Sequence, residues 1–119
     1  MNEQVQLELK KIFNGRFSTS ESTRANYARG EDTYDPVLSK AVVFPETNEE
    51  VSKVLKLCND HKIPVVPFGT GTSLEGNVVG NEKGITVSLE KMNKILNVNV
   101  EDFDCRVQAC VTKEQLNDY

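Results

Sequence analysis

The sequence predicts an α+β fold with α/β-like character, in which helices flank a small mixed sheet. Two segments, residues 3–13 and 47–60, carry apolar residues at helical spacing. Short runs of β-branched and apolar residues lie between and after these segments, so helix and strand patterns alternate along the chain. With 119 residues, the chain has the length of one domain and can bury a modest core.

Residues 1–40 are expected to form an N-terminal helix and a lead-in segment. The helix covers residues 3–13 and ends near Gly15. Four residues form its apolar face: Val5, Leu9, Ile12 and Phe13. The polar stretch at 18–35 predicts a short helix with loop. Three of its side chains could touch a cofactor, although packing or capping is the favoured interpretation: Tyr27, Asp32 and Tyr34.

Residues 41–119 form the second expected unit, which begins with a strand at 41–44. Thr47 and Glu50 have the spacing of a capping box and predict a helix that runs to about Asp60. Its apolar face again has four residues: Val51, Val54, Leu55 and Cys58.

Proline and alternation mark the strands that follow. Pro64 is expected to open the next strand and Pro67 to close it. Further strands are predicted at three places: 85–89, 95–100 and 105–111. Alternation in the last two predicts sheets with one buried face. Thr112 and Gln115 form a second capping box, which opens a short helix.

The run VVPFGTGTSLEG, residues 65–76, is the most informative segment of the chain. Glycines at 69, 71 and 76 are interleaved with hydroxyl residues at 70, 72 and 73. Glycine reaches positive φ and has no Cβ, so backbone N–H groups can approach a bulky anion closely. The hydroxyls add further hydrogen-bond donors. The pattern favours a phosphate-binding loop over a flexible surface turn.

Two common nucleotide-binding motifs are excluded. The G-x-G-x-x-G fingerprint needs a third glycine where the chain has Leu74. The P-loop needs Lys and Ser/Thr where the chain has Asn77 and Val78. Segment 77–84 has two glycines and no helical period, so no crossover helix fits between loop and next strand. Glu90 therefore matches the ribose-binding acid of a Rossmann domain only superficially.

From Ala41 to Tyr119 the sequence resembles a known family. The matching stretches are 41–45, 47–51, 63–76, 84–89, 92–96 and 107–112, of which the FGTGTSLEG segment is the most specific. They are similar to the N-terminal subdomain of the PCMH-type FAD-binding domain in FAD-linked oxidases of the vanillyl-alcohol-oxidase type. Within that family, the most similar group is that of cytochrome-linked D-lactate dehydrogenase and glycolate oxidase.

The resemblance implies FAD as cofactor and oxidation of a small D-2-hydroxy acid, D-lactate or glycolate, to the 2-oxo acid. It implies a set of residues at the cofactor diphosphate: Pro67, Phe68, Gly69, Thr70, Gly71, Thr72, Ser73, Leu74 and Gly76. It implies no catalytic residue within this segment. Two alternatives stay open: a truncated, non-catalytic remnant that acts as a binding or interaction module, and a loop that binds another nucleotide.

Cys110 departs from the family pattern, which has glycine there in a Val-x-x-Gly-Val-Thr motif. The family's strand passes near the dinucleotide, so a side chain at 110 could crowd the cofactor. The alternative is a tolerated compact residue.

The chain stops soon after its last helix begins, and no C-cap follows. Because family members continue for several hundred residues, we expect a domain that is incomplete at its C-terminus. The missing part of the domain, or a partner, would then cover exposed sheet surface.

Composition limits the partners, compartments and metal sites that the sequence allows. The net charge of −4 and a pI near 5.0 argue against a nucleic-acid partner. No apolar run is long enough to span a membrane, and the N-terminus lacks the pattern of a signal peptide. These features favour a cytoplasmic protein, peripheral to the inner membrane at most. Three cysteines without a C-x-x-C motif and a single histidine, His61, predict no metal site.

Overall fold

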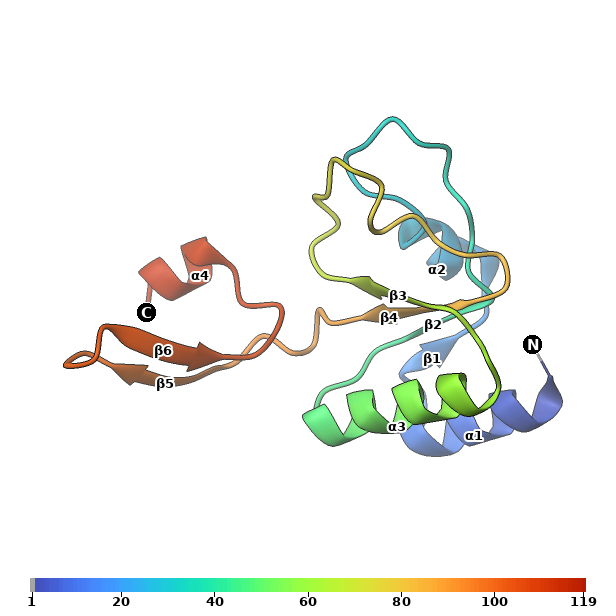
Figure 1. Ribbon diagram of the computed structural model, residues 1–119, viewed down its shortest axis with the longest axis horizontal. Helices are drawn as coiled ribbons and strands as arrows, with labels where there is room; N and C mark the ends of the chain where they lie inside the picture. Colours follow the sequence, from blue (N-terminus) through green and yellow to red (C-terminus); the bar gives the residue numbers. More distant parts are fainter. Residues whose placement is uncertain (1) are drawn as a thin grey trace.

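The computed structural model describes residues 2–119 and has a four-stranded mixed sheet at its centre (Figure 1). Its strands are β1 (Phe17–Ser18), β2 (Ala41–Val43), β3 (Val65–Phe68) and β4 (Ile85–Ser88), in the spatial order β1-β2-β4-β3. Strand β4 pairs in parallel with β2 and β3, whereas β1 is antiparallel to β2. The predicted α+β fold, a small mixed sheet flanked by helices, is confirmed.

Helices α1 (Glu3–Phe13) and α3 (Asn48–Asp60) cover one face of this sheet (Figure 1). The core lies between the helices and the two buried strands and consists of Val5, Leu9, Phe13, Ala41, Val43, Val54, Cys58, Ile85 and Val87. Burying one such large side chain stabilises the fold by about 1.5–3 kcal/mol. The predicted apolar face of α3 is only partly right, because Leu55 is 46% exposed.

Helix α1 has a cap at each end. The side chain of Asn2 accepts a hydrogen bond from the Val5 amide at 2.9 Å. At the other end, Asn14 and Gly15 turn the chain with φ of 40° and 97°. Glycine adopts such angles without strain, which is why this position ends the helix as the sequence predicted.

The opposite face of the sheet carries α2 (Glu21–Asn26) and two loops (Figure 1). Strand β3 lies at the edge of the sheet and is only half buried. Pro67 is a paired residue inside β3, opposite Val87, and the strand ends at Phe68. An edge strand tolerates proline because one side of its backbone has no partner strand.

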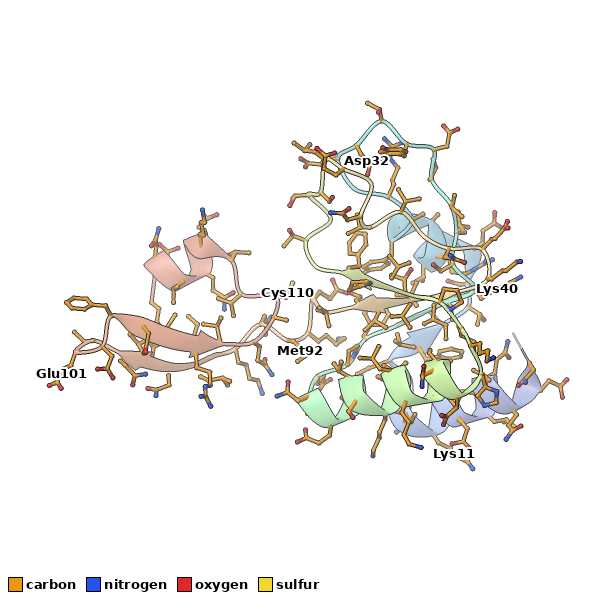
Figure 2. All side chains as sticks on the ribbon, viewed as in Figure 1. Lys11, Asp32, Lys40, Met92, Glu101 and Cys110 are labelled. Atoms are coloured by element: carbon orange, nitrogen blue, oxygen red, sulfur yellow. The ribbon has the colours of Figure 1, made fainter. Side chains whose placement is uncertain are left out.

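A smaller unit, here called the hairpin lobe (residues 95–119), extends from the end of the main sheet. It contains β5 (Ile95–Asn99), β6 (Asp104–Val107) and α4 (Lys113–Asn117). Residues 3–88 are here called the body. Figure 2 labels Met92 and Cys110 at the junction between the body and the hairpin lobe. The alternation in this region predicted a buried face, but neither strand has a buried residue. The last strand also ends at Val107, four residues earlier than predicted.

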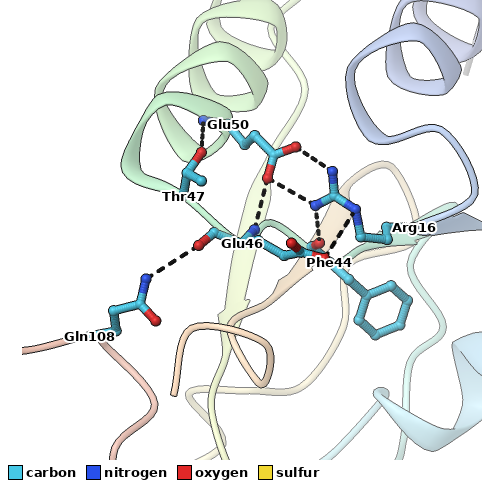
Figure 3. Close-up of polar contacts among 6 residues, drawn as sticks. All are labelled: Arg16, Phe44, Glu46, Thr47, Glu50 and Gln108. Atoms are coloured by element: carbon cyan, nitrogen blue, oxygen red, sulfur yellow. Dashed lines mark hydrogen bonds and ion pairs between the residues drawn. The ribbon is translucent and has the colours of Figure 1, made fainter. Parts of the chain in front are cut away.

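A partly buried ion pair ties the end of α1 to α3 within the body (Figure 3). The Arg16 guanidinium donates to both carboxylate oxygens of Glu50 and to the Phe44 carbonyl at 2.9 Å. Thr47 caps α3 as predicted, accepting the Glu50 amide at 3.2 Å. The Glu50 carboxylate accepts the Glu46 amide at 2.9 Å. Hydrogen bonding to Arg16 lowers the pKa of Glu50 to about 2.

Two further points concern organisation. No helix among residues 2–119 is long and apolar enough to cross a membrane. The division into residues 1–40 and 41–119 stays a prediction. In the structure, β1 from the first segment pairs with β2 from the second, and α1 packs against α3.

Candidate cofactor-binding site

The glycine loop, residues 69–76, leaves the sheet at the carboxyl end of β3. Because β3 and β4 run in parallel, the chain after β4 leaves at the same edge. An open pocket of about 640 Å³ lies there, the side of an α/β sheet on which ligands commonly bind. One wall consists of the last residue of β3 and the start of the loop: Phe68, Gly69, Thr70 and Gly71. The other walls come from the end of α2, the chain after β4 and the lead-in to α4: Asn26, Tyr27, Arg29, Glu90, Asn93, Cys110 and Gln115.

Gly71 is required by the shape of the loop. Its φ is 75°, and a Cβ built on it would lie 2.6 Å from Cζ of Phe68. The loop therefore folds back over the Phe68 ring at a point where no other residue fits. Gly69 is different, since its φ is not in the left-handed region and a Cβ there would meet nothing within 4 Å.

Six consecutive amides in the glycine loop, residues 69–74, donate no hydrogen bond to any group among residues 2–119. The neighbouring segment 77–84 also contains two glycines, but its amides at Val79, Gly80, Asn81, Lys83 and Gly84 all donate. Most backbone N–H groups in folded proteins are paired. Unpaired donors in sequence at the mouth of a pocket are the feature with which loops bind anions.

Two carbonyl groups of the loop, those of Gly71 and Ser73, point toward Gly30. The Gly71 and Ser73 oxygens lie against Gly30, where a Cβ would be 3.3 Å and 2.7 Å from them. In a planar trans peptide, N–H points opposite to the C=O of the same unit. The amides of Thr72 and Leu74 therefore point to the side of the loop opposite Gly30.

Tyr27 closes the bottom of the pocket. Its hydroxyl donates to Oε1 of Glu90 at 2.6 Å, and its ring meets Phe44 and Phe68 edge-on. Burial and the bond to Glu90 raise the pKa of Tyr27 to about 12, so the hydroxyl stays protonated at any ordinary pH.

Asp32 lies further out, in the loop that follows α2 at the top of the view in Figure 2. Asp32 is buried, and its Oδ1 accepts the Tyr34 amide at 3.0 Å. Its Oδ2 has no partner among residues 2–119. The Tyr34 ring lies over Gly76, where a Cβ would be 2.8 Å from it. Capping and packing are thus the contacts that these residues make.

The structure brings together only part of the predicted site. Phe68, Gly69, Thr70 and Gly71 line the pocket, whereas Thr72 and Ser73 continue the loop beyond it. Pro67 is exposed in β3, Leu74 is 70% exposed, and Gly76 is held by Tyr34. Glu75, the acid of the loop, is exposed.

Sequence analysis missed the pocket walls that the glycine pattern does not contain: Asn26, Arg29, Asn93 and Gln115. The signal that could have found Asn93 and Glu90 is their place just after β4. The Gln115 amide donates to Oγ1 of the N-cap residue Thr112 at 3.1 Å, as predicted, whereas its side-chain Nε2 donates to the Asn93 carbonyl at 2.6 Å.

Cys110 lies in a turn before α4, so its assignment to a strand was wrong. It nevertheless lines the pocket, across from the glycine loop. Burial and the nearby Glu90 charge raise the pKa of its thiol, which favours the protonated form.

The sequence matches one protein-family model, described as an FAD binding domain, over residues 39–119. That match covers more than half of the chain. The chain belongs to this family of FAD-binding domains. FAD is the cofactor that the family binds, and the glycine loop and most of the pocket of this FAD-binding domain fall inside the matched region.

Curated relatives of the FAD-binding domain are oxidoreductases. A protein of Danio rerio named probable D-lactate dehydrogenase, mitochondrial, is 39% identical over 102 residues, 86% of this chain. Glycolate oxidase subunit GlcD of Bacillus subtilis is 32% identical over 95 residues, 80% of the chain. The chain spans about a fifth of the length of both relatives, since each alignment covers 20% of that protein.

The fold recurs in a solved structure of alkyldihydroxyacetonephosphate synthase. It superposes with a TM-score of 0.89 and covers 99% of this chain and 24% of the other. At 18% identity, the likeness concerns the fold alone. The FAD-binding domain thus keeps its architecture, including the projecting hairpin lobe, through large changes of sequence.

Proposed function

We propose that this chain is the FAD-binding N-terminal portion of a flavin-dependent oxidoreductase that oxidises a D-2-hydroxy acid, D-lactate or glycolate, to the 2-oxo acid. The observation that carries the proposal is the run of six amides without internal partners in the glycine loop, residues 69–74. The names of the two relatives support the substrate class.

The residues present fit the diphosphate end of FAD. The diphosphate is an anion rich in acceptors, and the loop offers backbone donors together with the hydroxyls of Thr70, Thr72 and Ser73. The residues proposed to hold it are Pro67, Phe68, Gly69, Thr70, Gly71, Thr72, Ser73, Leu74 and Gly76. When bound, FAD supplies the redox chemistry by accepting a hydride. We assign no catalytic residue within residues 2–119.

Gly69→Val tests the loop without disturbing the fold. A Cβ at 69 would meet no protein atom within 4 Å apart from its chain neighbours, so this position has room for a side chain in the ligand-free protein. We expect FAD and ADP to bind at least about tenfold more weakly, while the urea midpoint stays unchanged. Gly71→Val is a poorer test, since strained φ and the clash with Phe68 would also destabilise the loop.

The matched control for Gly69→Val is Ala109→Val, which adds comparable bulk at an exposed position outside the pocket. Calorimetric titration with ADP and adenosine separates diphosphate binding from nucleoside binding. Unchanged ADP affinity in Gly69→Val would remove the loop from the cofactor site.

The dehydrogenase activity is tested in the full-length protein that carries this sequence, with D-lactate or glycolate and a dye acceptor. The 119-residue chain alone is expected to bind FAD with a Kd above about 1 µM, because small-molecule sites usually bury most of their ligand and this pocket is open. Flavin binding without turnover in the full-length protein would instead favour the alternative, a non-catalytic binding or interaction module.

An exposed groove in the hairpin lobe supports the proposal that further chain of the domain, or a partner, covers exposed sheet surface. It has a volume of about 800 Å³ and is lined by apolar side chains from both strands and α4, among them Leu96, Val98, Phe103, Leu116 and Tyr119. We propose that further chain of the domain, or a partner, covers it. The 119-residue chain should therefore bind the dye ANS, and the full-length protein should bind less.

The compartment is also a proposal. We favour the cytoplasm, at most beside the inner membrane, although the Danio rerio relative is named as mitochondrial. Cell fractionation followed by immunoblotting decides between these locations.

A further inference from the structure

Three aromatic rings form an edge-to-face cluster beneath the glycine loop. Tyr27, the C-cap residue of α2, lies between Phe44, just after β2, and Phe68, the last residue of β3. Its ring centroid is 5.5 Å from that of Phe44 and 5.1 Å from that of Phe68, and both pairs are edge-on at 75°. This is a favourable arrangement of aromatic rings, and it fixes Tyr27 between two strand ends.

The Phe68 ring supports the loop directly. A Cβ on Gly71 would lie 2.6 Å from Cζ and 2.9 Å from Cε1 of Phe68, so the glycine backbone rests on the ring. Gly71 belongs to the run of unpartnered amides. A displacement of the Phe68 ring would therefore move the donors that face the ligand.

The other end of Tyr27 is anchored by Glu90. The phenol donates to Oε1 of Glu90 at 2.6 Å. Glu90 follows β4 by two residues, and its amide lies 3.5 Å from Oγ of Ser88, which is fully buried at the end of that strand. The anchor is thus attached to the central strand of the sheet.

Glu90 would otherwise be difficult to explain. It lines the same pocket as the glycine loop, where a carboxylate repels a phosphate. A contribution to the position of the loop, made through Tyr27, accounts for an acid at this place.

We propose that Tyr27 is a positioning residue for the phosphate loop: Glu90 holds its hydroxyl, and its ring holds Phe68 beneath Gly71, so that the amides of residues 69–74 stay in one conformation. This inference rests on the proposed function only in that the loop binds a diphosphate. Neither Tyr27 nor Glu90 has to touch the ligand.

The test is a double-mutant cycle in the 119-residue chain, with inorganic pyrophosphate and ADP as probes. Tyr27→Phe is expected to weaken binding about three- to fivefold, the effect of one hydrogen bond. Glu90→Ala should bind about three- to fivefold more weakly than Glu90→Gln, since both remove the charge but only glutamine keeps the acceptor. In the Glu90→Ala background, Tyr27→Phe should have no further effect.

The matched control is Tyr34→Phe. Tyr34 packs on the other positive-φ glycine of the loop, Gly76, and its hydroxyl makes no hydrogen bond within residues 2–119. The affinities of this variant should equal those of the original protein. If Glu90→Gln restores the affinity that Glu90→Ala loses, the loss reflects the position of the loop and not a general loss of stability. A urea titration of every variant measures its stability separately.

Two results would overturn the inference: unchanged affinity in Tyr27→Phe, or an undiminished effect of Tyr27→Phe when Glu90 is already alanine. If the original chain binds neither probe, the proposal that this loop binds a diphosphate fails, and the positioning role is decided by NMR. The amide resonances of Gly69 and Gly71 should then shift in Tyr27→Phe and Glu90→Ala but stay in place in Glu90→Gln and Tyr34→Phe. Unshifted resonances in the first two variants would end the proposal.

Discussion

The body and the hairpin lobe differ in where their apolar side chains lie. Every residue of β2 and β4 in the body is buried, and the core between sheet and helices is continuous. In the hairpin lobe no strand residue is buried, and Phe103 and Val100 are 96% and 78% exposed. An isolated two-stranded hairpin is marginally stable in water. The stability of the chain therefore resides in the body.

Two phenylalanines give the largest expected contrast. Phe13→Ala removes a fully buried ring and should reduce the free energy of unfolding by about 3–5 kcal/mol. Phe103→Ala removes an almost fully exposed ring and should change it by less than about 0.5 kcal/mol. Urea denaturation measures both. Similar losses in the two variants would show that the lobe has a core of its own.

Hydrogen exchange compares the two units without any substitution. The Val87 amide in β4 should exchange at least about a hundredfold more slowly than the Val98 amide in β5. The reason is that β4 opens only with the body, whereas the hairpin opens locally. Equal protection of the two amides would mean that body and lobe unfold as one cooperative unit.

The Arg16–Glu50 pair tests whether the body depends on polar contacts besides its core. Glu50→Gln should cost about 1–2 kcal/mol at pH 7, after allowance for its partial exposure. Because folding lowers the pKa of Glu50 to about 2 from its ordinary value of 4.5, its contribution is complete above pH 4.5. This contribution is lost as the pH falls toward 2. The free energies of unfolding of Glu50→Gln and the original protein should therefore become equal near that pH.

The control for this pair is Asp60→Asn, which removes an exposed ion pair with Lys56 of 3.5 Å at the other end of α3. It should cost less than about 0.5 kcal/mol. A pH-independent difference between Glu50→Gln and the original protein would mean that Glu50 acts through packing and not through its charge.

The smallest effect is expected in the lobe. Val100→Thr replaces an exposed side chain with one of the same shape and should leave the free energy of unfolding within about 0.5 kcal/mol. Light scattering should decrease, since the substitution removes apolar surface. A loss of more than about 1 kcal/mol would show that Val100 is buried by contacts in solution.

The sequence predicted the body well because local and tertiary signals agree there. Spacing of Val5, Leu9 and Phe13 matches a helix that does bury those residues, and Gly15 ends it in the left-handed region. In the lobe they disagree. Apolar and polar residues alternate in Val98-Asn99-Val100 as they should in a strand with one buried face. Burial, however, depends on what covers a strand, and periodicity does not contain that information.

In the site, too, features of single residues could be predicted, whereas contacts between distant residues could not. The loop at Gly69–Gly71 was identified because the missing Cβ of glycine, and the positive φ that Gly71 adopts, are properties of single residues. The pairs Arg16–Glu50 and Tyr27–Glu90 join residues far apart in the chain, and only the fold brings them together. Thr47 and Glu50 were read as a complete capping box, but Arg16, a partner no local window contains, takes the carboxylate.

The strand order β1-β2-β4-β3 has a consequence for folding of the chain during its synthesis on the ribosome. The central strand, β4, is the last of the four to be synthesised, and Ala41 must wait for Ile85 before it gains its parallel partner. Until then β3 has no neighbour at all, and the apolar faces of α1 and α3 have an unfinished sheet to pack on. Such long-range parallel pairing is slow, and it leaves nascent chains open to aggregation. The interval before residue 85 emerges is therefore when the unpaired strands of the body are most exposed to aggregation.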